Sequence, residues 1–151
     1  MPNSLLVIGL WLTVLAACVF ALVKGGPAER FGGALTLAIS LSFLTVNALL
    51  PEQARPIPHL VLDGVLAVGF LFLAVRYASL WIGAVMLLQG IQFSLHAYFF
   101  VTKLTPGVTY AVVNNAVTIG TIVGLLCGTV VASRRERLSK SVGVARLPQG
   151  S

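Results

Sequence analysis

Charged residues are scarce in this sequence. Only 9% of its 151 residues are Asp, Glu, Lys or Arg, whereas soluble domains carry about 25%. In contrast, 58% of the residues are hydrophobic, and the mean hydropathy is +0.98. A water-soluble fold of this size could not bury so much apolar surface. The composition therefore excludes a soluble catalytic domain and indicates an integral membrane protein.

Cysteine is also rare, which argues against a disulfide-based scaffold. Cys18 and Cys127 both lie in apolar runs, where a free cysteine behaves as a small hydrophobic residue. The stretch Leu15–Cys18 resembles a bacterial lipoprotein cleavage site, at which Cys18 would be lipidated. However, no Lys or Arg precedes the apolar run, and the run continues to Val23. We therefore expect the first apolar segment to be retained.

The sequence lacks the common hydrolase motifs HExxH and GxSxG, and its single aspartate excludes a pair of catalytic aspartates. We therefore predict that the protein is not an enzyme. The net charge of +6 could suggest nucleic acid, but half of the ten basic residues lie after residue 133, without interleaved aromatic residues. We expect this tail, residues 133–151, to be disordered and to contact anionic lipid headgroups. Nucleic acid is not an expected partner.

Five hydrophobic runs follow one another along the chain, each close to the ~20 residues that span a bilayer. They cover residues 5–23, 32–50, 57–75, 80–101 and 110–132. Gly and Pro residues separate most of them. The junction at 76–79 contains neither, but residues 57–101 are far too long for one crossing. We predict an all-α bundle of five transmembrane helices within residues 1–132.

The basic residues predict the orientation of these helices. With alternating crossings, one side of the membrane receives Lys24, Arg30, Arg76, Arg134, Arg135, Arg137, Lys140 and Arg146. The other side receives Arg55 and Lys103. Because basic loops stay in the cytoplasm, the N-terminus is predicted outside and the C-terminus inside. Tyr77 and Trp81 are then expected at the cytoplasmic interface, and Tyr110 near the outer one.

Small residues recur at every fourth position of the fifth run, most clearly at Gly120, Gly124 and Gly128. Such a stripe allows two helix backbones to approach closely. We expect it to pack against a neighbouring helix of the same chain. Homodimerisation through the stripe is the alternative, because the same motif serves both purposes.

Strongly polar side chains inside a bilayer are costly and therefore mark candidate functional positions. The candidates are Asn47, Asp63, Gln89, Gln92, His96 and Asn114. Folding each predicted hairpin about its turn places them at similar depth in the outer half, with His96 opposite Asn114. Helical spacing also puts Gln89, Gln92 and His96 on one face of their helix. We predict that four helices direct polar stripes towards one another.

This polar layer has several interpretations. It can be a set of interhelical hydrogen bonds, or it can line a pocket for a small molecule, proton or ion, with Asp63 and His96 as titrating groups. Either a pair between these two side chains or a protonated Asp63 would offset the cost of burying the carboxylate. His59, flanked by prolines near the surface, is expected to be solvated. Haem or metal ligation by histidines is a weaker alternative, because a second His pair is missing.

The chain resembles a group of small, uncharacterised inner-membrane proteins of alphaproteobacteria. The similarity lies in residues 25–30 (GGPAER), in Asp63, in residues 76–81 (RYASLW), and in Gln92 and His96. It covers about half of the chain. The resemblance implies a bacterial inner membrane and supplies no activity.

These observations favour a non-enzymatic membrane protein that binds a small ligand or serves as an accessory subunit of a larger complex. A small oligomeric transporter or proton-coupled channel that uses Asp63 and His96 is the first alternative. A membrane haem or metal protein is the second. Besides the lipid bilayer, the expected partners are further copies of the chain or a larger membrane complex.

Overall fold

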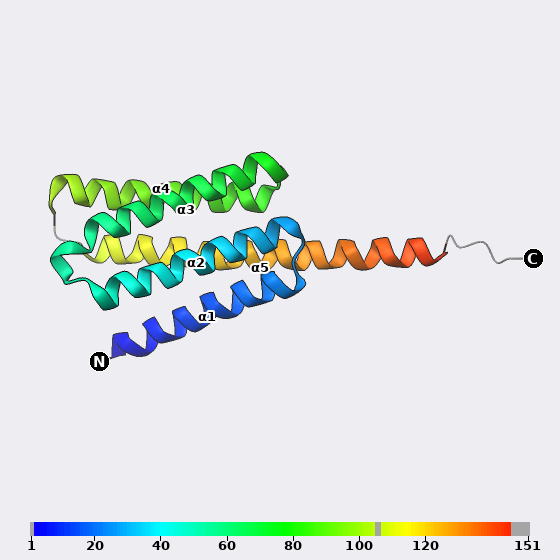
Figure 1. Cartoon of the computed structure of the whole chain (residues 1–151), viewed down its shortest axis with the longest axis horizontal. Helices are drawn as coiled ribbons and strands as arrows, with labels where there is room; N and C mark the ends of the chain where they lie inside the picture. The colour runs from blue at the N-terminus through cyan, green and yellow to red at the C-terminus, as the bar shows by residue number, and fades with distance from the viewer. Residues whose placement is uncertain (1, 105–106, 146–151) are drawn as a thin grey trace, which may run out of the picture.

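The computed structural model describes residues 2–104 and 107–145, with side chains from 8 to 139 outside that gap. It contains five α-helices and one short 3₁₀ turn, so the predicted all-α fold is confirmed (Figure 1). The helices are α1 (Pro2–Lys24), α2 (Pro27–Leu49), α3 (Pro56–Tyr77), α4 (Leu80–Thr102) and α5 (Val108–Ala145), and the turn η1 (Glu52–Ala54) precedes α3.

Local features of the chain mark several of the helix boundaries. Pro27 stands at the first position of α2, where its missing N–H costs no hydrogen bond. Ala78 reverses the chain between α3 and α4 in the left-handed conformation, with φ of 44°. At the end of α2, the Arg55 guanidinium donates to the carbonyl oxygens of Leu50 (2.9 Å) and Asn47 (3.0 Å). This side chain therefore satisfies carbonyl groups that the helix leaves unpaired.

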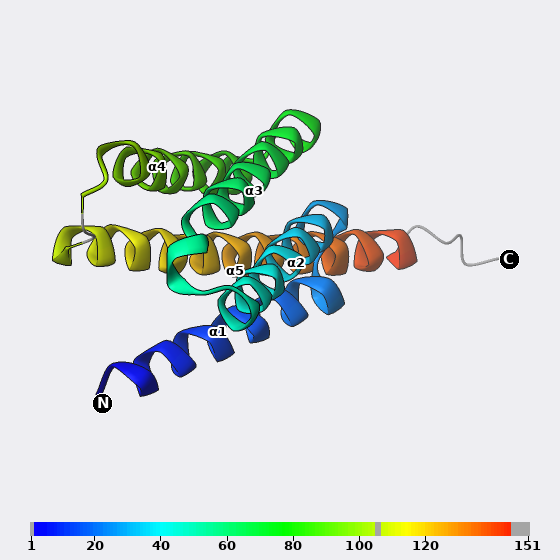
Figure 2. The same cartoon turned by 60° about the vertical axis from the view of Figure 1, so that its left-hand side comes forward.

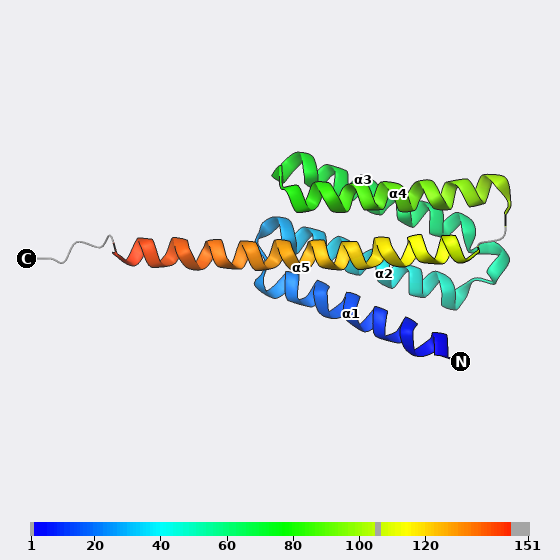
Figure 3. The ribbon, with the colours of Figure 1, turned by 180° about the vertical axis from the view of Figure 1, so that it is seen from behind.

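The helices form a ring in which each packs against the next in sequence, and α5 closes the ring against α1 and also touches α2. Figures 2 and 3 show α5 running past the other helices and extending well beyond them at its C-terminal end. The α1–α2 and α3–α4 connections lie at one end of the bundle. The α2–α3 and α4–α5 connections lie at the other end, near the N-terminus.

The helices α4 and α5 come into close contact through the predicted glycine stripe. A Cβ on Gly124 would lie 2.6 Å from Val85, and one on Gly128 would lie 2.5 Å from the Trp81 indole. Val85 and Trp81 of α4 therefore pack directly against the glycines of the stripe. The indole points into the bundle, where its Nε1 donates to the buried Glu29 carboxylate at 3.1 Å. Trp81 therefore packs between helices of the bundle. The prediction of an interfacial position for Trp81 did not include its contact with Glu29.

Large apolar side chains cover the outer surface of the ring, among them Leu12, Val19, Leu41, Val68 and Leu87. Four helices, α2 to α5, are long and apolar enough to cross a membrane. In α1 the apolar stretch with described side chains, Ile8–Lys24, is shorter. An apolar exterior on helices of this length is what contact with lipid requires. The chain is a polytopic helical membrane protein.

The C-terminal segment differs from its prediction. Disorder was expected from residue 133, but α5 continues as a helix to Ala145. Arg, Glu, Leu and Lys dominate residues 134–140, and all four favour helix, so the segment extends a helix that is already nucleated. The prediction is therefore wrong for residues 133–145. Residues 146–151 lie outside the described part.

Candidate functional site

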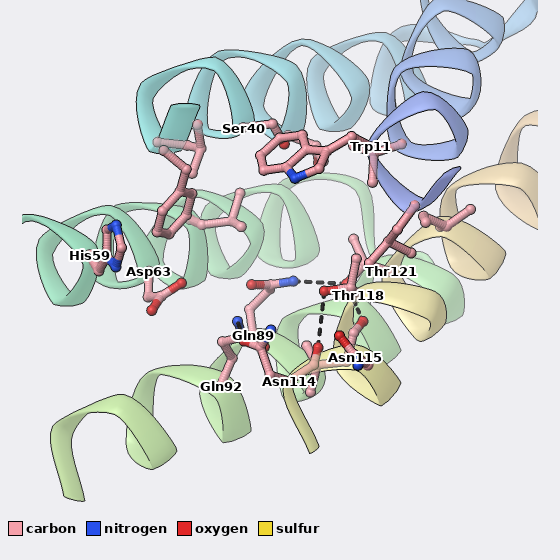
Figure 4. A pocket seen from close by; sticks show the side chains of 18 of the residues that line it. Trp11, Ser40, His59, Asp63, Gln89, Gln92, Asn114, Asn115, Thr118 and Thr121 are labelled. Atoms are coloured by element: carbon pink, nitrogen blue, oxygen red, sulfur yellow. Dashed lines mark hydrogen bonds between the residues drawn. The ribbon is translucent and has the colours of Figure 1, made fainter. Parts of the chain in front are cut away.

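The centre of the ring contains a cavity of about 360 Å³, to which all five helices contribute side chains. Its polar lining comprises Thr36, Ser40, Asn47, His59, Asp63, Gln89, Gln92, His96, Tyr110, Asn114, Asn115, Thr118 and Thr121. Figure 4 shows side chains of α2, α3, α4 and α5 directed towards this space, with the Trp11 indole reaching in from α1. The lining residues come from the N-terminal halves of α3 and α5 and from the middle and C-terminal parts of α2 and α4. The cavity therefore lies towards the end that carries the α2–α3 and α4–α5 connections.

All six polar residues predicted from the sequence line this one cavity. Asp63 and Gln89 are buried, Gln92, His96 and Asn114 are partly buried, and Asn47 lies exposed at the margin. The predicted polar stripes thus face one another in the structure. Their role as ligand or ion contacts stays a prediction.

Asp63, His96 and Tyr110 form a chain of hydrogen bonds across α3, α4 and α5. His96 Nδ1 contacts Asp63 Oδ2, and the Tyr110 hydroxyl contacts His96 Nε2. The Asp63 side chain is only 2% exposed and that of His96 12%. When His96 is neutral, its Nδ1–H donates to the carboxylate and the tyrosine O–H donates to Nε2. The expected pair between Asp63 and His96 is present, and Tyr110 extends it.

Two amide hydrogen bonds fix α4 against α5 on the same side of the cavity. Gln89 Nε2 donates to Thr121 Oγ1 at 2.8 Å, and Gln92 Nε2 donates to Asn114 Oδ1 at 2.7 Å. The second bond shows that Gln92 faces Asn114. His96 itself contacts Tyr110, one helical turn before the predicted Asn114, whereas the Gln89–Thr121 pair keeps the predicted register.

Three polar atoms on the cavity wall are buried without a hydrogen-bond partner within the described part of the chain. They are Thr36 Oγ1, His59 Nε2 and Gln92 Oε1, contributed by α2, α3 and α4. Leaving such a group unsatisfied costs about 1–3 kcal/mol, so native structures rarely contain several together. All three are therefore available to a molecule that occupies the cavity.

His59 is only partly solvated. Its ring packs against Phe43 with centroids 5.0 Å apart, and its Nε2 is buried. The prolines that suggested a surface position instead start α3, which turns His59 towards α2. The His59 ring therefore forms part of the cavity wall.

Sequence reasoning missed further members of the site. Tyr110 was assigned to the outer interface, although its position four residues before Asn114 puts both on one face of α5. That spacing could have identified it. Trp11 carried no such signal, because an aromatic residue in an apolar run faces lipid as readily as a cavity.

The side chains around the cavity do not form an evident metal site. Among the described residues, no group of three or more His, Cys, Asp or Glu side chains is close enough to hold a metal ion. Both ring nitrogens of His96 are already engaged, by Asp63 and Tyr110. An axial haem ligand needs a free imidazole nitrogen, so His96 would have to give up one of these contacts.

Comparison of the chain with protein-family models, with curated protein sequences and with solved structures found no match. The side chains around the cavity therefore provide the evidence from which a function can be inferred.

Proposed function

We propose that this protein is a non-enzymatic membrane protein that binds a small amphiphilic molecule in the cavity between its helices. The observation that carries the proposal is the set of three unpaired buried atoms on the cavity wall, Thr36 Oγ1, His59 Nε2 and Gln92 Oε1. They come from three different helices and line the same space. A bound molecule with polar groups at matching positions would recover the cost of their burial.

The size and composition of the cavity support the same function. A volume of about 360 Å³ lies within the range of small-molecule pockets. Apolar side chains such as Val14, Ile39 and Leu66 share the lining with the amides and hydroxyls. Ligand pockets in general combine a mainly apolar wall with a few well-placed polar groups.

We further propose that all five helices cross a bacterial inner membrane, with the N-terminus and the cavity towards the outside. Lys24, Arg30 and Arg76 lie near the connections at one end of the bundle, and the basic C-terminal part of α5 projects from this end. Cytoplasmic placement of this end satisfies the positive-inside rule. The resemblance to alphaproteobacterial inner-membrane proteins points to the same membrane. Association with further copies or with a larger membrane complex belongs to this proposal.

Native mass spectrometry of the protein purified in mild detergent tests ligand binding. We expect the wild-type protein to carry a small bound molecule. Thr36→Val removes one unpaired hydroxyl while keeping its shape and should reduce the occupied fraction. Thr45→Val is the matched control, because Thr45 lies on the same helix, is exposed, and uses its hydroxyl within α2.

Equal occupancy in the two threonine variants would remove Thr36 from the binding site. The proposal as a whole would be overturned if the wild-type protein carries no molecule and its Trp11 fluorescence does not respond to cationic, anionic or neutral amphiphiles.

Proton-coupled transport is a second candidate function, favoured by the hydrogen-bonded chain of Asp63, His96 and Tyr110. Chains of titratable groups inside a membrane are typical of proton pathways. Proteoliposomes that contain a pH-sensitive dye test this function. Proton flux that is present in the wild-type protein and abolished in Asp63→Asn, with the fold intact, would support transport. Absence of flux in the wild-type protein would refute proton transport and leave ligand binding as the proposed function.

A further inference from the structure

We infer that the cavity selects a monovalent organic cation, a primary ammonium group on an apolar body, and that this cation competes with a proton for the Asp63–His96 pair. The inference rests on the proposed ligand binding and names the chemical class of the ligand. Charge, hydrogen-bonding capacity and aromatic lining support it independently.

The charge of the cavity favours a cation. Asp63 is the only carboxylate among the described lining residues, and no Lys or Arg side chain accompanies it there. With His96 neutral, the pair carries one negative charge, and among the described residues the hydrogen-bond partner of the carboxylate is the partly buried His96 imidazole. An uncompensated charge at this depth is costly, and a cation in the cavity would offset the cost. An anionic ligand would meet the carboxylate and be repelled.

The unpaired atoms favour a ligand that donates hydrogen bonds. Gln92 Oε1 can only accept, and Thr36 Oγ1 and His59 Nε2 can accept as well. A primary ammonium group has three N–H donors and no acceptor. Its hydrogen-bonding capacity therefore matches what the wall lacks, whereas a ligand with acceptors only, such as a quinone, would leave Gln92 unsatisfied.

Aromatic side chains complete the match. The rings of Trp11, Phe43 and Tyr110 line the cavity from three helices. The faces of such rings attract cations, by about 2 kcal/mol or more when water is excluded. The same rings can also pack against the apolar part of the ligand.

A proton bound to His96 would neutralise the negative charge of the pair, as a bound cation would. The protonated imidazole and the Asp63 carboxylate together carry no net charge, so the attraction for a second cation disappears. The other titratable groups that line the cavity are His59 from α3, Tyr110 from α5 and Cys18 from α1, whereas α2 contributes only uncharged side chains. Arg55 lies beyond His59, where it caps α2. His96 is therefore the group at which a proton and the cation exclude each other.

Protonation of His96 would also reverse the direction of its hydrogen bond with Tyr110. When Nε2 of His96 binds a proton, it becomes a donor and the tyrosine oxygen must accept. The tyrosine hydroxyl hydrogen is then released towards another acceptor. Protonation thus changes the donor pattern of the cavity wall as well as its charge.

Two probes with the same skeleton test the inference, 2-phenylethylammonium and its neutral counterpart 2-phenylethanol. Binding is followed through the fluorescence of Trp11 in detergent, and Trp11→Phe shows which part of the signal arises in the cavity. The alkylammonium stays charged at about pH 5.5 and about pH 8, whereas histidines titrate between these values. We expect amine affinity to rise with pH, by up to about tenfold per pH unit, and alcohol affinity to stay constant.

Variants assign the effect to the pair. His96→Gln keeps the Asp63 charge and an N–H donor, so amine binding should persist while its pH dependence is lost. Asp63→Asn should reduce amine affinity at least tenfold and spare the alcohol. Tyr110→Phe should alter the pH dependence, whereas Tyr98→Phe, an exposed tyrosine on α4, should leave it unchanged. If Asp63→Asn does not fold, the pH dependence of amine binding in His96→Gln decides whether the proton and the cation compete at this pair.

The outcomes separate this inference from the proposed function. Equal, pH-independent binding of amine and alcohol would overturn cation selection and leave ligand binding in place. Amine binding whose pH dependence survives in His96→Gln would overturn the competition at this residue. Binding of neither probe would overturn the inference, and together with ligand-free protein in native mass spectrometry it would overturn the proposed function as well.

Discussion

Replacing Gly128 with alanine should destabilise the bundle, although alanine is intrinsically the better helix former. In an exposed helix, Gly→Ala stabilises by about 1 kcal/mol. At Gly128 the new methyl group would lie 2.5, 2.7 and 2.8 Å from three atoms of the Trp81 indole. Carbon atoms in contact prefer about 3.5–4.0 Å, so the indole or the backbone of α5 must move by roughly 1 Å.

The indole cannot make this movement freely. Trp81 is held by its hydrogen bond to Glu29 at 3.1 Å, and it also packs close to Gly32 of α2. Overpacking a well-filled contact costs about 1–3 kcal/mol, and a lost hydrogen bond adds about 1 kcal/mol. After the gain in helix propensity is subtracted, Gly128→Ala should lower the free energy of unfolding by about 1–3 kcal/mol.

Thermal unfolding in detergent measures this loss. The buried thiol of Cys18 is a convenient reporter in a Cys127→Ser background, because a thiol-reactive dye labels it only when the bundle opens. For a chain of this length, 1 kcal/mol corresponds to about 2–4 °C in Tm.

Two further glycines provide matched controls. Nothing lies within 4 Å of a Cβ on Gly83, so Gly83→Ala should be neutral or slightly stabilising. A Cβ on Gly120 meets only one close atom, a methyl group of Leu88 that can rotate away, so Gly120→Ala should lie between the two. If Gly128→Ala is as stable as Gly83→Ala, the close contact between α4 and α5 is refuted.

Three other substitutions test separate contacts. Glu29→Gln keeps an acceptor for the Trp81 indole and should hardly change Tm, whereas Glu29→Leu leaves the N–H unsatisfied and should cost about 1–3 kcal/mol in thermal unfolding. A double-mutant cycle of Gln89→Leu and Thr121→Val should give a coupling near 0.6 kcal/mol, the average for interhelical hydrogen bonds in membranes. Ala78→Gly should raise stability by about 1 kcal/mol, because glycine adopts the left-handed conformation without strain, and an unchanged Tm would contradict this geometry.

Hydropathy and spacing predicted much of this molecule. The five helices follow from apolar runs of membrane-spanning length, and the meeting of Asp63 with His96 follows from the cost of an isolated carboxylate in lipid. Both predictions rest on strong physical constraints. An apolar run of about 20 residues has few alternatives to a helix, and a buried charge has few alternatives to a partner.

The rotation of each helix was less predictable. Lipid and protein interior are equally apolar, so an apolar residue has no strong preference for either. Trp11 therefore gave no sign that it lines the cavity, and Trp81 gave none that it points inwards. Glu29 follows a glycine–proline turn and is buried at the start of α2, and no sequence signal indicated this. Only the tertiary arrangement brings it to the indole.

The two ends of the bundle pack by different means, and this difference explains why a cavity persists at one of them. At the end near Trp81, glycines let α4 and α5 approach until side chain meets backbone. Towards the other end, the facing positions carry amides, an imidazole and a phenol, which hold the helices apart at hydrogen-bonding distance through their side chains. Without a hydrophobic drive between helices in lipid, these polar contacts keep the ring together around an open centre. The side chains that prevent collapse are thus the same ones that a ligand would contact.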